Sequence, residues 1–113
     1  DRAVQYRRVL QSLDQLRASL AIGVPVVFGF SVYDSFESDV VAKTGIVQLP
    51  EKSEQLLGGH AVMCVGYDNA SERFIVRNSW GVNWGKAGYF TMPQAYVLNS
   101  NLADDFWSIK LVR

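Results

Sequence analysis

The sequence predicts an α+β domain in which one N-terminal helix precedes an antiparallel, barrel-like sheet of about five strands. Three observations predict this class. Apolar residues recur near helical spacing in the first 22 positions, residues 26–33 form a dense apolar run, and two strand-like runs at 60–67 and 74–77 flank a turn-rich stretch at 68–71. The chain has 113 residues, of which 49% are hydrophobic, and this suits a single domain with its own core.

The predicted helix covers residues 1–22. Asp1 is able to cap its first turn, and Gly23 is placed to end it. The apolar positions near helical spacing are Val4, Leu10, Leu13, Leu16 and Leu20. We therefore expect one amphipathic helix at the start of the chain.

Residues 26–33 have the apolar density and β-branching of a buried strand. Residues 34–43 are polar and mixed and predict no regular element, whereas residues 44–49 predict a second short strand and residues 50–57 a solvated loop. After the hairpin, glycines punctuate a tryptophan-containing segment, and a strand resumes at 88–92. A helical turn at 93–98, a loop at 99–105 and a last strand at 106–112 complete the prediction.

The hairpin is expected to bring His60 close to Asn78. His60 opens its first strand and Asn78 closes its second, so antiparallel pairing places both residues at one end of the sheet. An amide oxygen there is able to hold an imidazole ring in one orientation, which is the supporting half of a Cys-His-Asn nucleophilic site. Taken alone, a single histidine is more often bonded to a core acceptor, and an asparagine in Asn-Ser-Trp-Gly is more often a turn residue.

Two sequence blocks carry a resemblance to a known family. GHAVMCVGYD at 59–68 and FIVRNSWGVNWGKAGYF at 74–90 resemble the C-terminal half of a papain-like (C1 family) cysteine peptidase. The resemblance implies that residues 1–113 form the right-hand, β-barrel domain of the papain fold. It also implies that His60 is the catalytic histidine and that Asn78 orients it. Trp80 would cover the His60–Asn78 bond, although taken alone it is as well explained as a core residue.

The resemblance further implies what this chain lacks. In the family, the nucleophilic cysteine and a glutamine that helps to bind the oxyanion lie upstream, in a helical N-terminal half that forms the cleft with the β domain. We therefore expect this chain to act on a peptide or protein substrate only together with such a half, from the same precursor or as a separate chain. Alone it is predicted to be inactive.

Substrate-binding residues are assigned by the same resemblance. Gly29, Ala61 and Asp104 match the main specificity pocket, and Trp84 matches the tryptophan on the leaving-group side of the cleft. Gly59 stands where many relatives have Asp or Asn before the histidine. If Asp104 points into the pocket, a basic side chain at the second residue before the cut is favoured; otherwise Asp104 is a solvated loop acid.

Cys64 is the one cysteine of the chain, and it is not expected to be the nucleophile. Four residues along a strand separate it from His60 by roughly 13 Å, which is far beyond hydrogen-bond reach. Its apolar neighbours predict a small buried side chain, and one cysteine excludes an internal disulfide. One histidine and one cysteine are also too few for an ordinary zinc site, so we expect no metal and no cofactor.

Charge and hydropathy indicate neither a nucleic-acid nor a membrane partner. Eleven basic and eleven acidic residues cancel, and no apolar run approaches the roughly 20 residues that span a bilayer. Because the chain begins at Asp1, we expect a processed product or part of a longer protein; the family resemblance favours a secreted, periplasmic or lysosome-like compartment.

Three other functions remain open from the sequence. One is a homologue that has lost its cysteine and binds a peptide or protein without cutting it. Another is a stand-alone interaction domain that dimerises through the face a second domain would cover. The third is an amidase or transglutaminase-like acyl transfer on the same triad.

Overall fold

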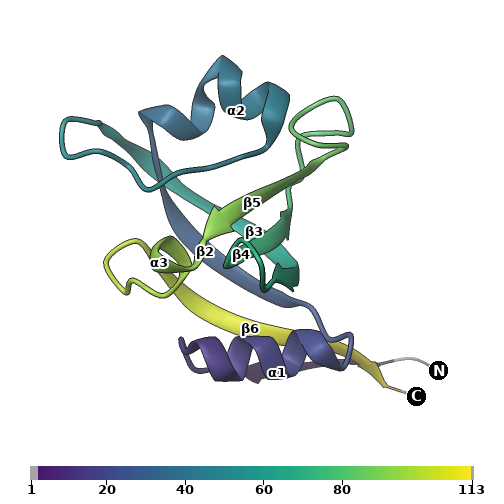
Figure 1. Cartoon of the computed structure of the whole chain (residues 1–113). Coiled ribbons are helices and arrows are strands. Elements are labelled where there is room, and N and C mark those ends of the chain that lie inside the picture. Colours follow the sequence, from purple (N-terminus) through teal and green to yellow (C-terminus); the bar gives the residue numbers. More distant parts are fainter. Residues whose placement is uncertain (1–2, 113) are drawn as a thin grey trace.

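The computed structural model describes residues 3–112 and contains one antiparallel sheet with short helices (Figure 1). Between these residues the sheet has six strands in the order β1-β6-β2-β3-β4-β5. The predicted α+β class with an antiparallel sheet is therefore confirmed. The elements in chain order are β1 (Ala3–Arg8), α1 (Leu13–Ala21), β2 (Val26–Tyr33), η1 (Asp34–Glu37), α2 (Asp39–Thr44), β3 (Leu56–Asp68), β4 (Arg73–Arg77), β5 (Tyr89–Pro93), α3 (Gln94–Val97) and β6 (Ala103–Val112).

The predicted helix over 1–22 is wrong in its first half. Residues of β1 pair along their whole length with β6, from Ala3 opposite Val112 to Arg8 opposite Trp107. The helix begins only after Ser12, whose side chain accepts a hydrogen bond from the backbone N–H of Gln15 at 3.1 Å. Pairing with a strand about a hundred residues away thus overrode the local apolar spacing, and Asp1 lies outside the described residues.

The end of α1 and the strand β2 agree with the sequence prediction. Gly23 follows the helix with a φ of +78°, a conformation that glycine adopts without steric cost. Strand β2 spans the predicted residues, and its side chains alternate between buried and half-buried. Its buried positions are Val26, Phe28, Phe30 and Val32.

The segment after β2 differs from the prediction in two ways. Residues 34–44 form the short helices η1 and α2, and the second is capped by Ser38, whose hydroxyl accepts from the N–H of Val41. The predicted strand at 44–49 is wrong, because only an isolated bridge between Ile46 and Thr91 forms there. The chain leaves α2 through Gly45, at a φ of +67°, and then only runs beside β5.

The hairpin and the C-terminal elements are confirmed, with shifted boundaries. Strand β3 begins at Leu56, inside the predicted loop and before His60, and continues into the hairpin with β4. The predicted strand at 88–92 is β5, and the predicted helical turn is α3, which begins directly after Pro93. Strand β6 starts at Ala103, three residues before the predicted start.

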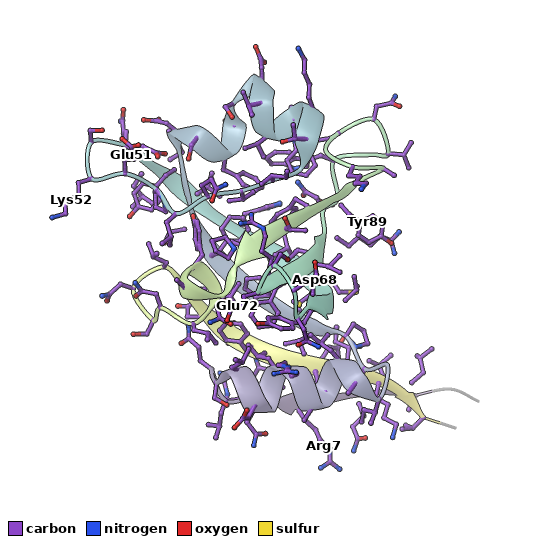
Figure 2. All side chains as sticks on the ribbon, viewed as in Figure 1. Arg7, Glu51, Lys52, Asp68, Glu72 and Tyr89 are labelled. Atoms are coloured by element: carbon purple, nitrogen blue, oxygen red, sulfur yellow. The ribbon has the colours of Figure 1, made fainter. Side chains whose placement is uncertain are left out.

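The core lies on the face of the sheet that α1 covers. Alternate residues of the central strands point into it and meet Leu16 of the helix. Charged side chains such as Arg7, Glu51 and Lys52 lie on the outside of the molecule (Figure 2). Within residues 3–112, no helix is long and apolar enough to cross a membrane.

Candidate active site

The structure brings His60 and Asn78 together, as the hairpin geometry predicts. His60 lies on β3 opposite Phe30 of β2, and Asn78 directly follows β4. The Nε2 of His60 and the Oδ1 of Asn78 are 2.9 Å apart. Asn78 is also held at its backbone, where its N–H donates to the carbonyl of Gly88 at 3.0 Å. Both ends of the pair are thus fixed by the sheet.

The direction of this hydrogen bond follows from a second contact. The backbone N–H of Ser79 donates to the same Oδ1 of Asn78 at 2.8 Å. A backbone N–H is only a donor, so the atom at this place is the amide oxygen and the Nε2 of His60 must donate to it. The proton of the neutral ring therefore sits on Nε2, and the lone pair of Nδ1 remains free to accept a proton.

One tryptophan ring stacks on the imidazole, and a second packs against the first. The ring of Trp80 stacks on that of His60, with centroids 5.2 Å apart and an interplanar angle of 27°. Trp84 meets Trp80 edge to face at 5.2 Å. Trp80 keeps 43% of its surface exposed, so it is not a plain core residue. Trp80 thus covers one face of the His60 ring.

Phe36 is a member of this site that sequence reasoning missed. It lies in η1, is 1% exposed, and packs at the centre of the aromatic group that includes His60 at 6.3 Å and Trp80 at 5.4 Å between ring centroids. The signal in the sequence was one large apolar residue within the polar stretch 34–38. That signal is weak, because only the tertiary fold shows which rings it meets.

A hollow of about 270 Å³ adjoins His60, lined by parts of β2 and β3, the loop at 100–102 and the start of β6. Three of the predicted substrate residues, Gly29, Gly59 and Asp104, line it together with His60. Ala61 pairs with Gly29 across β2 and β3 but lines a neighbouring hollow with Asn78, and Trp84 lies against Trp80 instead. The five predicted residues therefore divide among three places around the histidine.

Asp104 stands over Gly29 at the edge of this hollow. A β-carbon at position 29 would lie 3.5 Å from the Oδ1 of Asp104, which is an ordinary van der Waals distance. Within residues 3–112, Asp104 takes part in no ion pair, and it supplies the one carboxylate among the residues that line the hollow. Its charge is therefore available to a bound group.

Cys64 is buried on the core side of β3, as predicted. It is 2% exposed, and its Sγ donates a weak hydrogen bond to the carbonyl of Gly66 at 3.6 Å. Burial raises the pKa of the Cys64 thiol to about 12, so the sulfur stays protonated and unreactive near neutral pH. Among the described residues, no three His, Cys, Asp or Glu side chains gather as a metal site would require.

Comparison with known proteins gives concordant matches. A family profile described as "Papain family cysteine protease" matches residues 2–108. The uncharacterised peptidase C1-like protein L477 of Acanthamoeba polyphaga mimivirus is 51% identical over 88% of this chain and 32% of its own length. Cathepsin B-like cysteine proteinase 4 of Caenorhabditis elegans is 38% identical over 71% of this chain and 23% of its own length.

Solved structures show the same fold. Xylellain, a cysteine protease from Xylella fastidiosa, superposes with a TM-score of 0.87 at 53% identity, covering 96% of this chain and 40% of that protein. Bromelain from Ananas comosus, in complex with the inhibitor E64, has a TM-score of 0.65 at 25% identity, covering 93% of this chain and 49% of the other. The chain thus spans less than half the length of the proteins it matches.

Proposed function

This chain belongs to the papain family of cysteine proteases, and from that membership we propose that it supplies the histidine and asparagine of a site that hydrolyses peptide bonds. The observation that carries the proposal is the hydrogen bond from His60 Nε2 to Asn78 Oδ1, whose direction Ser79 fixes. It leaves Nδ1 as the basic nitrogen of the ring. A general base needs such a free lone pair within reach of the proton it takes.

In the proposed mechanism, the Nδ1 of His60 takes the proton of a cysteine thiol supplied by the helical half. The resulting thiolate attacks the carbonyl carbon of the peptide bond, and the imidazolium then gives its proton to the departing amine, leaving a thioester. His60 next takes a proton from water, which attacks the thioester and releases the acid and the thiol. Asn78 stays neutral throughout and only orients the ring.

The nucleophile has to come from outside this chain. Cys64, the one cysteine in the sequence, is buried with a raised pKa and faces the core. The chain covers 40% of xylellain, and we assign the cysteine and an oxyanion-binding glutamine to the part that it does not match. Residues 1–113 are accordingly one domain of a two-domain site, and the isolated chain is inactive.

The test is a chimera in which residues 1–113 replace the matching part of xylellain. We expect it to cleave peptide amides and to react once with a thiol-directed peptide probe, and we expect His60→Ala to abolish both. The 113-residue chain alone should do neither. A folded chimera that binds peptides but never cleaves them would overturn the proposal in favour of a homologue that only binds. A chimera whose cleavage survives His60→Ala would show that another group is the base.

We further propose that the hollow beside His60 receives the side chain of the second residue before the cut, and that Asp104 makes a basic side chain preferred there. The uncompensated carboxylate supports this. A charged hydrogen bond is worth about 1.5–3 kcal/mol, and because Asp104 is solvent-exposed we expect the lower end, about a tenfold preference for arginine over leucine in kcat/KM. Asp104→Ala should remove the preference, and an unchanged ratio would refute this role.

A further inference from the structure

Strand β6 carries two consecutive aspartates, and a β-bulge decides which of them faces the hollow. Along β2, Val27 pairs with Trp107 and Gly29 pairs with Asp104. Two steps along β2 thus correspond to three steps along β6, so β6 holds one extra residue between these pairs. In a regular ladder Gly29 would stand opposite Asp105, and Asp104 would project from the other side of the sheet.

The bulge is centred on Asp105, whose backbone is left-handed with a φ of +59°. Such a conformation is uncommon outside glycine, and aspartate is one of the few residues that tolerates it. The buried residues on either side, Ala103 and Phe106, both face the core although three positions separate them. The shift in register is therefore built into the packing of β6.

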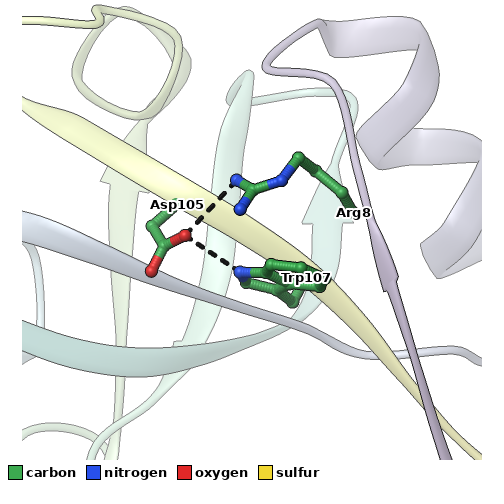
Figure 3. A network of polar contacts seen from close by, with 3 residues as sticks. All are labelled: Arg8, Asp105 and Trp107. Carbon is green, nitrogen blue, oxygen red and sulfur yellow. Dashed lines mark hydrogen bonds and ion pairs between the residues drawn. The ribbon is translucent and has the colours of Figure 1, made fainter.

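The side chain of Asp105 is held by two donors (Figure 3). Its Oδ1 accepts from the indole Nε1 of Trp107 at 2.9 Å and from the Nη1 of Arg8 at 3.3 Å. The guanidinium carbon of Arg8 also lies 4.2 Å from the centroid of the Trp107 ring. Arg8 is the β1 residue paired with Trp107, so the network joins the bulge to the edge strand of the sheet.

We propose that Arg8, Asp105 and Trp107 are positioning residues that fix the β6 bulge and so place Asp104, rather than its neighbour, at the substrate hollow. This rests on the proposed role of Asp104 in selecting a basic side chain. Arg8 pairs with Asp105, so of the two adjacent aspartates Asp104 is the one that has no ion pair among the described residues. The preference for a cationic group is thus set by a contact on β1, a strand that contributes no residue to the lining of the hollow.

The first experiment measures register directly in the 113-residue chain. Cross-strand NOEs from Gly29 to Asp104 report the bulged pairing, whereas NOEs from Gly29 to Asp105 report a regular ladder. Asp105→Gly still allows the positive φ at this position but removes the carboxylate that accepts from Trp107 and Arg8. Arg8→Leu removes only the guanidinium donor. Asp105→Asn is the matched control, because it tolerates the left-handed backbone and keeps an acceptor oxygen for Trp107. We expect the first two to weaken the Gly29–Asp104 NOEs and the control to preserve them.

The second experiment measures the ratio of kcat/KM for arginine against leucine at the second residue before the cut, in the chimera with xylellain. Asp105→Gly and Arg8→Leu should lower this ratio at least threefold while cleavage of the leucine substrate is unchanged, and Asp105→Asn should keep it. Unchanged NOEs and an unchanged ratio in both variants would overturn the inference. If Asp104→Ala itself leaves the ratio unchanged, the proposed role of Asp104 fails. The NOEs then still decide whether the network fixes the register.

Discussion

Replacing Asn78 by alanine should damage catalysis far more than stability, and the structure gives the reason. The substitution removes the Oδ1 that accepts from His60 and Ser79, and it also removes Nδ2, which is buried without a partner among the described residues. Each of the two lost hydrogen bonds lowers the free energy of unfolding by about 0.5–1.5 kcal/mol. In the native chain the buried, unpaired Nδ2 group costs about 1–3 kcal/mol, and removing that group restores this amount. These effects oppose each other, so we expect the free energy of unfolding to change by no more than about 1 kcal/mol.

The catalytic effect of Asn78→Ala has no such compensation. In the ion pair the imidazolium donates a charged hydrogen bond to Asn78, and losing that bond costs about 1.5–3 kcal/mol, or roughly ten- to a hundredfold in kcat/KM. The assays are urea unfolding of the chain, followed by tryptophan fluorescence, and peptide hydrolysis by the chimera with xylellain. Ser79→Ala is the control, because Ser79 contributes only its backbone N–H and its side chain is exposed. A loss of activity no larger than the loss of stability would refute the reasoning.

Three further predictions concern the surroundings of this pair. Trp80→Ala should lower kcat/KM for peptide hydrolysis about tenfold. Trp80→Phe should lower it much less, because a phenyl ring can still stack on His60. Equal losses of activity in the two variants would contradict this prediction. Cys64 stays protonated in the folded chain while its unfolded thiol ionises near pH 8.5, so stability should fall between pH 9 and 12 by up to about 1.4 kcal/mol per pH unit. Cys64→Ala, compared by urea unfolding at each pH, should remove this contribution and keep the fall above about pH 10 that the raised pKa of the buried Tyr96 hydroxyl adds. Gly85→Ala would place a β-carbon 2.5 Å from the carbonyl oxygen of Tyr89 and should lower the free energy of unfolding by more than about 3 kcal/mol. In Gly81→Ala the added β-carbon meets nothing within 4 Å, so this variant should lose only about 1 kcal/mol.

The parts of the fold that sequence predicted are those that local interactions determine. Strand β2 and the hairpin of β3 and β4 have dense apolar runs and a turn between neighbours, so their pattern is complete within a short stretch. The prediction for residues 3–8 was wrong because the structure of these residues depends on β6, about a hundred positions away. In addition, Ser12 and Gln15 are a recognisable start of a helix in the sequence. The prediction missed this start because Val4 and Leu10 also fit helical spacing and favoured a longer helix.

The same division separates the proposed catalytic pair, His60 and Asn78, from the proposed substrate hollow. His60 and Asn78 are 18 residues apart at one end of a single hairpin, so the sequence was enough to expect them close together, although a bulge between Cys64 and Gly66 sets their register. Asp104 reaches the hollow only because β6 carries a bulge, and the bulge is held by Arg8, 97 residues from Asp105. The local pattern of residues does not show which of the two adjacent aspartates faces Gly29, and it was the family resemblance that singled out Asp104.

With the functions proposed above, selectivity and catalysis are separable within one sheet. The bonds that hold His60 come from Asn78 and the loop after β4, whereas the bonds that hold the bulge come from β1 and β6. Since the two sets share no residue, a substitution at Arg8 is free to change which side chain the hollow prefers without moving the imidazole. Substrate preference in a chain of this kind should therefore be alterable from the β1 edge as well as from the hollow itself, by substitutions far in sequence from His60 and Asn78.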